Sequence, residues 1–323
     1  MTVLVTGGLG LVGIHTARYF AQQGHDVVCY DRKPVSPLAA AILGDAQRVE
    51  VVTGDIEDHA RLEEIMRSRG VQGVIHAAAV VNEKICREEP LVAARMNIGG
   101  SAAVLDVARR NGVQRFIYTS SATVYGPRRD RRPIAEDEAR PGHVYGYSKY
   151  LAEQWTECYQ KIYGLDCAIV RLSSVYGPGK SWAPDRYPKQ RLCLEAINGN
   201  RYTMPDGGDY RRDFTFVTDV AAGIHLVYAA PKLDHRVFNI AAGEIFSLRD
   251  VAQVLNTLFS RAKLDVAPGQ FEENVALQGS VRGPLSIDRA RRELDFAPRT
   301  DLRRGLEQYT EFIARHCITN PSP

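Results

Sequence analysis

The sequence predicts an α/β protein built on a doubly wound parallel sheet with a smaller, mixed C-terminal domain, and three observations support this prediction. Short runs rich in Val and Ile alternate with amphipathic helical stretches through the first half of the 323 residues. These runs are apolar on both faces, as strands are when helices cover both sides of a parallel sheet. The alternation stops after about residue 176. Right-handed crossovers between successive strands then favour a doubly wound sheet.

The first half supplies the strands and helices of this sheet. We expect strands at Val3–Val5, Val27–Tyr30, Val49–Val52, Val74–His76, Phe116–Thr119 and Cys167–Val170. We expect helices at 11–23, 57–69, 91–110 and 147–163. Each of these helices lies between two of the strands, as the crossover of a βαβ unit does.

Proline and glycine interrupt the pattern in the second half, beginning with Gly177-Pro178-Gly179. Helical patterns return at 218–229, 247–258 and 301–315. We expect two domains, because the length of the chain favours about two. The first would comprise residues 1–171, with about 214–241 returning to the sheet, and the second would comprise 172–213 and 242–323.

Composition excludes several classes of protein. With 24% charged and 45% hydrophobic residues, the chain is not a collagen, a disordered segment or a coiled coil. Its net charge of +3 gives no reason to expect nucleic acid or a membrane surface as a partner. It has no run of about 18 uninterrupted apolar residues and no leader before the first strand. We therefore expect no membrane span and a cytoplasmic location.

The six cysteines are scattered, without a C-x-x-C pair or a histidine at ligand spacing. Cys29 and Cys167 lie inside apolar strand-like runs and are expected to be buried thiols. We therefore favour free thiols over disulfides and predict no metal site.

A glycine-rich turn, TGGLGLVG at residues 6–13, follows the first strand directly. Gly7 permits a tight turn, Gly10 lets the backbone approach a pyrophosphate, and Gly13 lets the helix pack closely on the strand. A glycine-rich turn without a ligand is the alternative, but the strand–turn–helix setting favours a Rossmann-like dinucleotide site. The N–H groups that begin the helix would face the phosphates, among them those of Leu11 and Val12.

The next three strands end in residues that suit NAD. Asp31 ends the second strand, 18 residues after Gly13, and its carboxylate can accept both ribose hydroxyls while repelling a 2′-phosphate. This favours NAD over NADP, although Asp31 could also be a turn residue before Pro34. The other expected cofactor contacts follow the third and fourth strands and are Asp55, Ile56, Ala77, Ala78 and Ala79.

A candidate catalytic group follows the fifth strand. Tyr145 and Lys149 are four residues apart and share one face of a helix, and Ser121 lies at the sheet edge upstream of them. A free tyrosine has a pKa of about 10, so Tyr145 needs nearby positive charge to act as a base. Lys149 and a nicotinamide ring could supply that charge, and Ser121 could orient a sugar hydroxyl. An ordinary surface Tyr–Lys pair is the alternative.

Together these motifs resemble the extended short-chain dehydrogenase/reductase family, in its NAD-dependent nucleotide-sugar epimerase/dehydratase branch. The resemblance covers nearly the whole chain and includes Asn97, Arg171, the segment Val175-Tyr176-Gly177-Pro178-Gly179 and the stretch 208–219. It implies that Asn97 lies on the cofactor side, Ser173 near the nicotinamide, and Arg212 at a nucleotide-sugar diphosphate. Read from the residues alone, Arg212 beside Asp213 would form a surface ion pair.

The residues after Ser121 narrow the reaction. Where the family's sugar 4,6-dehydratases have an Asp-Glu pair, this chain has Ala122 and Thr123, as in 4-epimerases similar to UDP-galactose 4-epimerase. The resemblance thus implies C4 epimerisation of a nucleotide sugar with retained NAD. A dehydrogenase that releases NADH and a non-catalytic NAD-binding regulator are the alternatives. Ser174 stands where the family often has an Asn that contacts the nucleotide, so it is a further candidate substrate contact.

Two further features concern partners. Four of the five residues 128–132 are arginines, which predicts a solvated loop rather than a polyanion site, because no aromatic residues are interleaved. The helices at 91–110 and 147–163 are apolar on more than one side. The resemblance suggests that they form a homodimer interface, with an intramolecular core as the alternative, and the residues concerned are Val104, Leu105, Leu151, Trp155 and Tyr159.

Overall fold

The computed structural model describes residues 1–128, 130–179, 181–269 and 283–318. Its centre is a seven-stranded parallel sheet in the order β11-β6-β5-β4-β1-β2-β3, which confirms the predicted fold class. Six of these strands coincide with the six expected ones. The strands are β1 (Thr2–Thr6), β2 (Asp26–Asp31), β3 (Val49–Thr53), β4 (Val71–His76), β5 (Arg115–Ser121), β6 (Cys167–Leu172) and β11 (Val237–Ile240).

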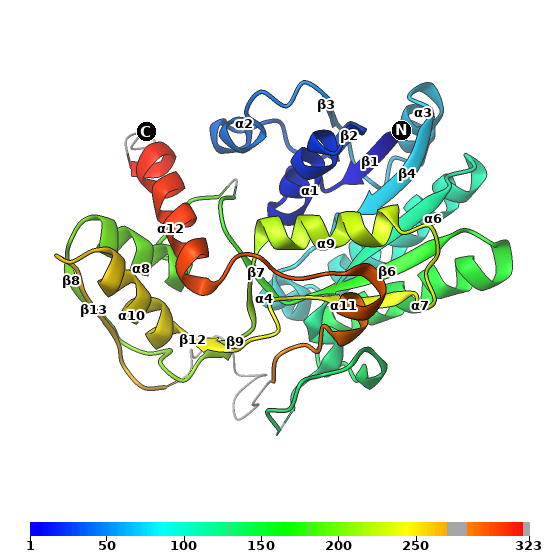
Figure 1. The fold of residues 1–323 in the computed structure, drawn as a ribbon. Helices are drawn as coiled ribbons and strands as arrows, with labels where there is room; N and C mark the ends of the chain where they lie inside the picture. Colours follow the sequence, from blue (N-terminus) through cyan, green and yellow to red (C-terminus); the bar gives the residue numbers. More distant parts are fainter. Residues whose placement is uncertain (129, 180, 270–282, 319–323) are drawn as a thin grey trace.

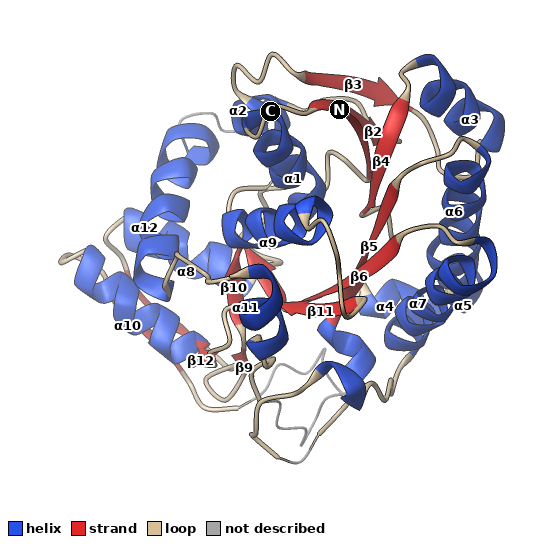
Figure 2. Cartoon of the chain, turned by 45° about the vertical axis from the view of Figure 1, so that its right-hand side comes forward, coloured by secondary structure: helices blue, strands red, loops and turns tan. Residues whose placement is uncertain are grey.

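Helices cover both faces of the sheet (Figure 2). One face packs against α1 (Leu11–Gln22), α2 (Pro37–Leu43), α9 (Val217–Ala229) and α11 (Asp288–Leu294). The other face packs against α3 (His59–Ser68), α6 (Gly100–Arg110) and α7 (Val144–Tyr163). Along β1, Val3 and Val5 enter the first core while Leu4 enters the second. This alternation explains why the strands are apolar on both faces.

The expected helix at 91–110 consists of three parts. These are α5 (Pro90–Ala93), a π-helical turn (Ala94–Gly99) and α6, and they follow the short α4 (Glu83–Glu88). By length and apolar composition alone, Pro90–Arg110 could cross a membrane, and 56% of its most apolar window is buried inside the protein. Val104 and Leu105 lie fully in the core between sheet and helices. The helix therefore packs against protein.

A second lobe lies beside the carboxyl edge of the sheet (Figure 1). Its helices are α8 (Pro188–Ile197), α10 (Leu248–Leu258) and α12 (Leu302–Ile313). They surround a separate apolar core that includes Leu192, Leu255 and Leu306. Its strand pairs are β7 (Ser174–Tyr176) with β10 (Phe214–Phe216), β8 (Arg201–Met204) with β13 (Lys263–Val266), and β9 (Arg211–Arg212) with β12 (Phe246–Ser247).

The chain passes between the two lobes more than once. α9 and β11 return to the main sheet, and the segment from Leu285 to Phe296, which contains α11, also packs into its core. The division into 1–171 with 214–241, and 172–213 with 242–323, remains our proposal for the domains. The six cysteines all lie in the described residues and form no disulfide with one another, and Cys29 and Cys167 are buried as predicted.

Candidate active site

The glycine turn between β1 and α1 is tightly constrained. Gly7 has a φ of +63°, and a Cβ on it would lie 2.7 Å from the Cα of Ala78. A side chain at Gly13 would collide with the carbonyl of Gly7. The amide of Gly10 donates to the carbonyl oxygen of Gly7 at 2.8 Å, and α1 begins without a side-chain cap. The first N–H groups of α1, including those of Leu11 and Val12, thus have no side chain covering them.

The predicted cofactor residues gather along the carboxyl edge of the sheet. The Asp31 carboxylate accepts hydrogen bonds from the amides of Leu9 at 3.0 Å and Lys33 at 3.1 Å. It therefore ties the glycine turn to the end of β2. Asp55 and Ile56 follow β3, and Ala77, Ala78 and Ala79 follow β4, where the amide of Ala77 donates to the carbonyl oxygen of Thr6 at 3.1 Å.

Tyr145 lies in the first turn of α7, which begins three residues earlier than expected. The reason is its cap, since His143 Nδ1 accepts a hydrogen bond from the amide of Gly146 at 3.2 Å. The side chains of Tyr145 and Ser121, the last residue of β5, lie close enough to interact. The structure thus brings these two predicted residues together.

Burial governs the electrostatics of Tyr145. Burial raises the pKa of Tyr145 to about 12, and the interaction with Ser121 offsets this rise only in part. The lowering of this pKa by Lys149 together with a nicotinamide ring stays a prediction. A buried phenolate costs more than a buried phenol, so the phenol stays protonated until more positive charge arrives.

Lys149 is almost fully buried, with 2% of its surface exposed. Its Nζ lies 4.3 Å from the centre of the Tyr118 ring. Burial lowers the pKa of Lys149 to about 7, while Glu153, one turn further along α7, raises it. Glu153 in turn pairs with Arg171 of β6 through two hydrogen bonds of 2.9 and 2.7 Å. The ammonium therefore sits beside an aromatic face and near a carboxylate that is already neutralised.

Asn97 lies on the π-helical turn and connects several elements. Its Nδ2 donates to Ser148 Oγ at 2.9 Å and to the carbonyl oxygen of Val80 at 3.0 Å. Its Oδ1 accepts from the amide of Val80 at 2.8 Å. Because Ser148 precedes Lys149, Asn97 fixes the end of α7 that carries Tyr145 and Lys149 against the loop after β4.

A buried histidine that the sequence reading missed extends this network. Ser101 donates to the carbonyl oxygen of Asn97 at 2.6 Å, so its hydroxyl must accept from His76 Nε2, 3.0 Å away. His76 Nδ1 then accepts from Thr6 Oγ1 at 2.6 Å. Burial and the charge of Lys149 lower the pKa of His76 to about 3. A neutral His76 thus links the glycine turn to the helix that carries Asn97, and the sequence signal was a histidine in an apolar strand.

The predicted substrate residues lie at the junction of the two lobes. Ser173 donates to the carbonyl oxygen of Asp213 at 2.5 Å, and the amide of Ser174 donates to the same oxygen at 3.0 Å. The guanidinium of Arg212 lies 4.1 Å from the centre of the Tyr210 ring. Arg212 precedes Asp213, so these bonds and the β7–β10 pairing bring its backbone near Ser173 and Ser174.

Asp213 does not form the surface ion pair considered as the alternative for Arg212. Its carboxylate is buried and accepts hydrogen bonds from four donors, which are the amides of Ala242, Gly243 and Leu285 and the hydroxyl of Thr215. Desolvation raises the pKa of Asp213 to about 6. The carboxylate thus joins β10 to two loops. These four bonds come from residues other than Arg212.

The arginine run is less solvated than expected. Arg128 pairs with Glu138 and Asp130, each at 3.0 Å, and only 12% of its side chain is exposed. Arg132 also pairs with Glu138, at 2.5 Å. Arg129 lies outside the described residues. The expectation of a solvated loop is therefore wrong at Arg128, because Glu138 and Asp130 hold its side chain against the protein.

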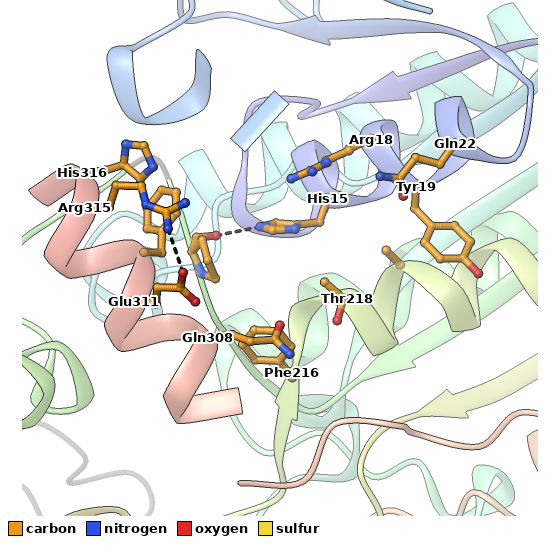
Figure 3. A pocket seen from close by; sticks show the side chains of 13 residues that line it. His15, Arg18, Tyr19, Gln22, Phe216, Thr218, Gln308, Glu311, Arg315 and His316 are labelled. Carbon is orange, nitrogen blue, oxygen red and sulfur yellow. Dashed lines mark hydrogen bonds and ion pairs between the residues drawn. The ribbon is translucent and has the colours of Figure 1, made fainter. Parts of the chain in front are cut away.

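A pocket of about 370 Å³ lies between α1, α9 and α12 (Figure 3). His15 on its wall contacts the carbonyl oxygen of Pro178 at 2.9 Å, and Arg315 pairs with Glu311 at 2.8 Å. None of the predicted site residues lines it. In the described ranges of the chain, no group of three His, Cys, Asp or Glu side chains could hold a metal ion.

Comparison with known proteins places this site in a family. The model of the NAD dependent epimerase/dehydratase family matches residues 3–241. UDP-glucose 4-epimerase of Corynebacterium glutamicum is 28% identical over 332 residues, covering 97% of this chain and 96% of that protein.

Two solved structures extend the comparison. The UDP-glucose 4-epimerase of Thermotoga maritima, solved with UDP-glucose, matches with a TM-score of 0.84 and 26% identity, covering 98% of this chain and 99% of that chain. MoeE5, solved in complex with UDP-glucuronic acid and NAD, matches with a TM-score of 0.80 and 25% identity, covering 98% of this chain and 99% of that chain. By sequence and by fold, the chain belongs to the NAD-dependent epimerase/dehydratase family.

Proposed function

We propose that the chain is an NAD-dependent epimerase of a nucleotide-diphosphate sugar that inverts C4 through a transient 4-keto sugar and retains its NAD. One observation carries the proposal. The side chains of Ser121 and Tyr145 meet at the carboxyl edge of the sheet, with Lys149 buried one turn further along α7. Ala122 and Thr123 follow Ser121, so the chain has no Asp-Glu pair there for the elimination of water.

The residues around the glycine turn fit NAD. Gly7 has the positive φ that the tight turn requires, and the uncapped start of α1 offers N–H groups to a pyrophosphate. Asp31 stands at the end of β2, where it would meet the adenosine ribose. Bound NAD would supply the acceptor and donor of hydride. The residues proposed to hold it are Gly7, Gly10, Leu11, Val12, Gly13, Asp31, Asp55, Ile56, Ala77, Ala78, Ala79, Asn97, Tyr145, Lys149 and Ser173.

Tyr145 would remove the proton from the C4 hydroxyl and later return it to the same oxygen. Burial raises the pKa of Tyr145 to about 12, and only the phenolate form can act as the base. Positive charge beside the phenol is therefore needed to favour loss of its proton. The ammonium of Lys149 and the nicotinamide ring would supply that charge. Ser121 would donate a hydrogen bond to the reacting oxygen and hold it in line with Tyr145.

The substrate would lie between the lobes, with Ser121, Ser174 and Arg212 as contacts. The planar guanidinium of Arg212 suits a diphosphate, since its N–H groups can pair with two phosphate oxygens. Relatives named for UDP-glucose, and a neighbour solved with UDP-glucuronic acid, support a UDP-sugar. We therefore propose UDP-glucose and UDP-glucuronic acid as the first substrates to test.

A substrate panel tests this function. The purified protein is incubated with UDP-, dTDP- and GDP-sugars, and the products and NADH are measured. An isomer without net NADH supports the epimerase. An oxidised product with accumulating NADH would instead identify a dehydrogenase, and bound NAD without any turnover would identify a regulatory NAD-binding protein.

We further propose that the protein is a cytoplasmic homodimer that pairs through α7. Leu151 and Trp155 lie on one face of this helix with 49% and 45% of their surfaces exposed. Of the other residues considered for this interface, Val104, Leu105 and Tyr159 are buried within the chain and belong to its own core. The proposed interface therefore rests on the exposed face of α7, extended by Tyr147, Ile162 and Tyr163.

A further inference from the structure

A second lysine with aromatic contacts, Lys189, lies partly buried in the other lobe. It is the second residue of α8, and its Nζ lies 3.8 Å from the centre of the Phe214 ring and 5.2 Å from that of Tyr176. Phe214 pairs in register with Ser174 across the two strands β10 and β7. The Lys189 side chain therefore lies beside the paired strands β7 and β10, which include the proposed substrate contact Ser174.

Lys189 has no counter-ion in the part of the chain that the structure describes. No carboxylate there pairs with it, and its contacts are the two aromatic faces. Lys149, the comparable lysine of the first lobe, has Glu153 nearby. A partly buried ammonium without a counter-ion is less stable as a cation than one in water, because aromatic faces replace only part of its lost hydration.

The charged and titratable groups that face Lys189 in the described residues supply no negative charge to balance its own. Burial lowers the pKa of Lys189 to about 7, and the charge of Arg212 lowers it further, while Cys193 on α8 raises it. Tyr176 on β7 and Cys193 both have pKa values raised by burial, so neither is an anion near neutral pH. Two basic groups, Lys189 and Arg212, thus act on one region without an acid between them.

We propose that Lys189 binds the diphosphate of the nucleotide sugar together with Arg212, and that Lys189 takes up a proton from solvent when the diphosphate binds. The neutral amine gains the proton, and the resulting ammonium pairs with a phosphate oxygen. No other bond forms or breaks. This inference rests on the proposed function for its ligand class, and it predicts that affinity falls as pH rises above the pKa of the free lysine.

Calorimetric titration tests the proposal with UDP, dTDP and GDP as probes. At pH 8 the terminal phosphate of each probe is already ionised, since its second pKa is about 6. Repeating the titration in two buffers of different ionisation enthalpy gives the number of protons taken up. We expect net uptake by the wild-type protein, and roughly tenfold or greater loss of affinity in Lys189→Met, as removal of a charged hydrogen-bond donor produces.

Two variants separate the possible outcomes. Lys189→Arg keeps the charge at all accessible pH, so it should bind the probe without taking up the proton. Lys161→Met, altered at an exposed lysine of α7, should behave as wild type. Thermal unfolding of each variant checks its fold. If Lys189→Met binds as tightly as wild type, or Lys189→Arg takes up the same proton, this inference is wrong while the proposed function stands. If the wild type binds none of the three probes, both are wrong.

Discussion

The ammonium of Lys149 lies over the ring of Tyr118, 4.3 Å from its centre, in a place where almost no solvent reaches it. This environment favours the neutral amine and lowers the pKa of Lys149 from 10.5 to about 7. In the unfolded chain the same lysine keeps its proton up to about pH 10. Folding at pH 8 or 9 therefore releases a proton from this group.

The proton release predicts a pH dependence of stability. Between about pH 7 and 10.5 the unfolded state binds more protons at Lys149, so its contribution to the free energy of unfolding rises with pH. Lys149→Met lacks this contribution. Urea unfolding of both proteins from pH 7 to 10 should show the wild type gaining stability relative to the variant, and parallel curves would contradict the assigned pKa. Lys189 is present in both proteins, so its effect cancels.

Tyr145→Phe removes the proposed base and keeps the ring. We expect kcat to fall about 10²- to 10⁴-fold, the usual contribution of a general base, with NAD binding nearly unchanged. Tyr147→Phe is the matched control, because Tyr147 lies on the same helix and is 52% exposed. Steady-state kinetics and a cofactor titration measure both effects. Full activity in Tyr145→Phe would remove Tyr145 from its proposed role.

The buried pair between Arg171 and Glu153 is expected to be important for stability. Arg171→Met would leave Glu153 as an uncompensated buried charge, which typically costs about 3–5 kcal/mol. Lys161→Ala, which breaks the exposed pair with Glu157, should cost less than about 1 kcal/mol. Denaturant unfolding measures both values. Equal losses in the two variants would show that burial of the Arg171 pair has no special effect.

Trp155→Glu tests the proposed interface on α7. A charge in the centre of an apolar interface should prevent a second copy from binding, so the variant should be monomeric where the wild type is dimeric. Tyr187→Glu is the control, because Tyr187 is similarly exposed, at 46%, but lies outside α7. Analytical ultracentrifugation reports the two masses. A monomeric wild type, or a dimeric Trp155→Glu, would exclude this interface.

Much of the first lobe could be predicted because its signals are local. The strand runs, the glycine turn and the four-residue spacing of Tyr145 and Lys149 depend only on neighbouring residues, and the structure confirms these elements. The start of α7 was missed because its cap is His143, while Ser, Thr, Asp and Asn are the usual caps. The short helix α8 was missed because few of its residues follow a clear apolar period.

The electrostatics of the site could not be predicted, because they depend on contacts between distant parts of the chain. Thr6 and His76 are 70 residues apart, yet their hydrogen bond fixes which nitrogen of the neutral His76 ring carries the proton. Asp213 is adjacent to Arg212 in sequence, but its four donors come from other segments as well as from Thr215. Burial likewise raises the pKa of Tyr145, and its spacing from Lys149 along one helix gives no sign of this.

The fate of the hydrogen on C4 tests the central claim most directly. UDP-glucose and UDP-glucuronic acid carrying deuterium at C4 are incubated with the enzyme, and the products are examined by NMR and mass spectrometry. If NAD is retained and hydride returns to the same carbon, the C4 epimer forms with its deuterium still at C4 and no NADH accumulates. Stoichiometric NADH carrying the label, with an oxidised product, would contradict the account.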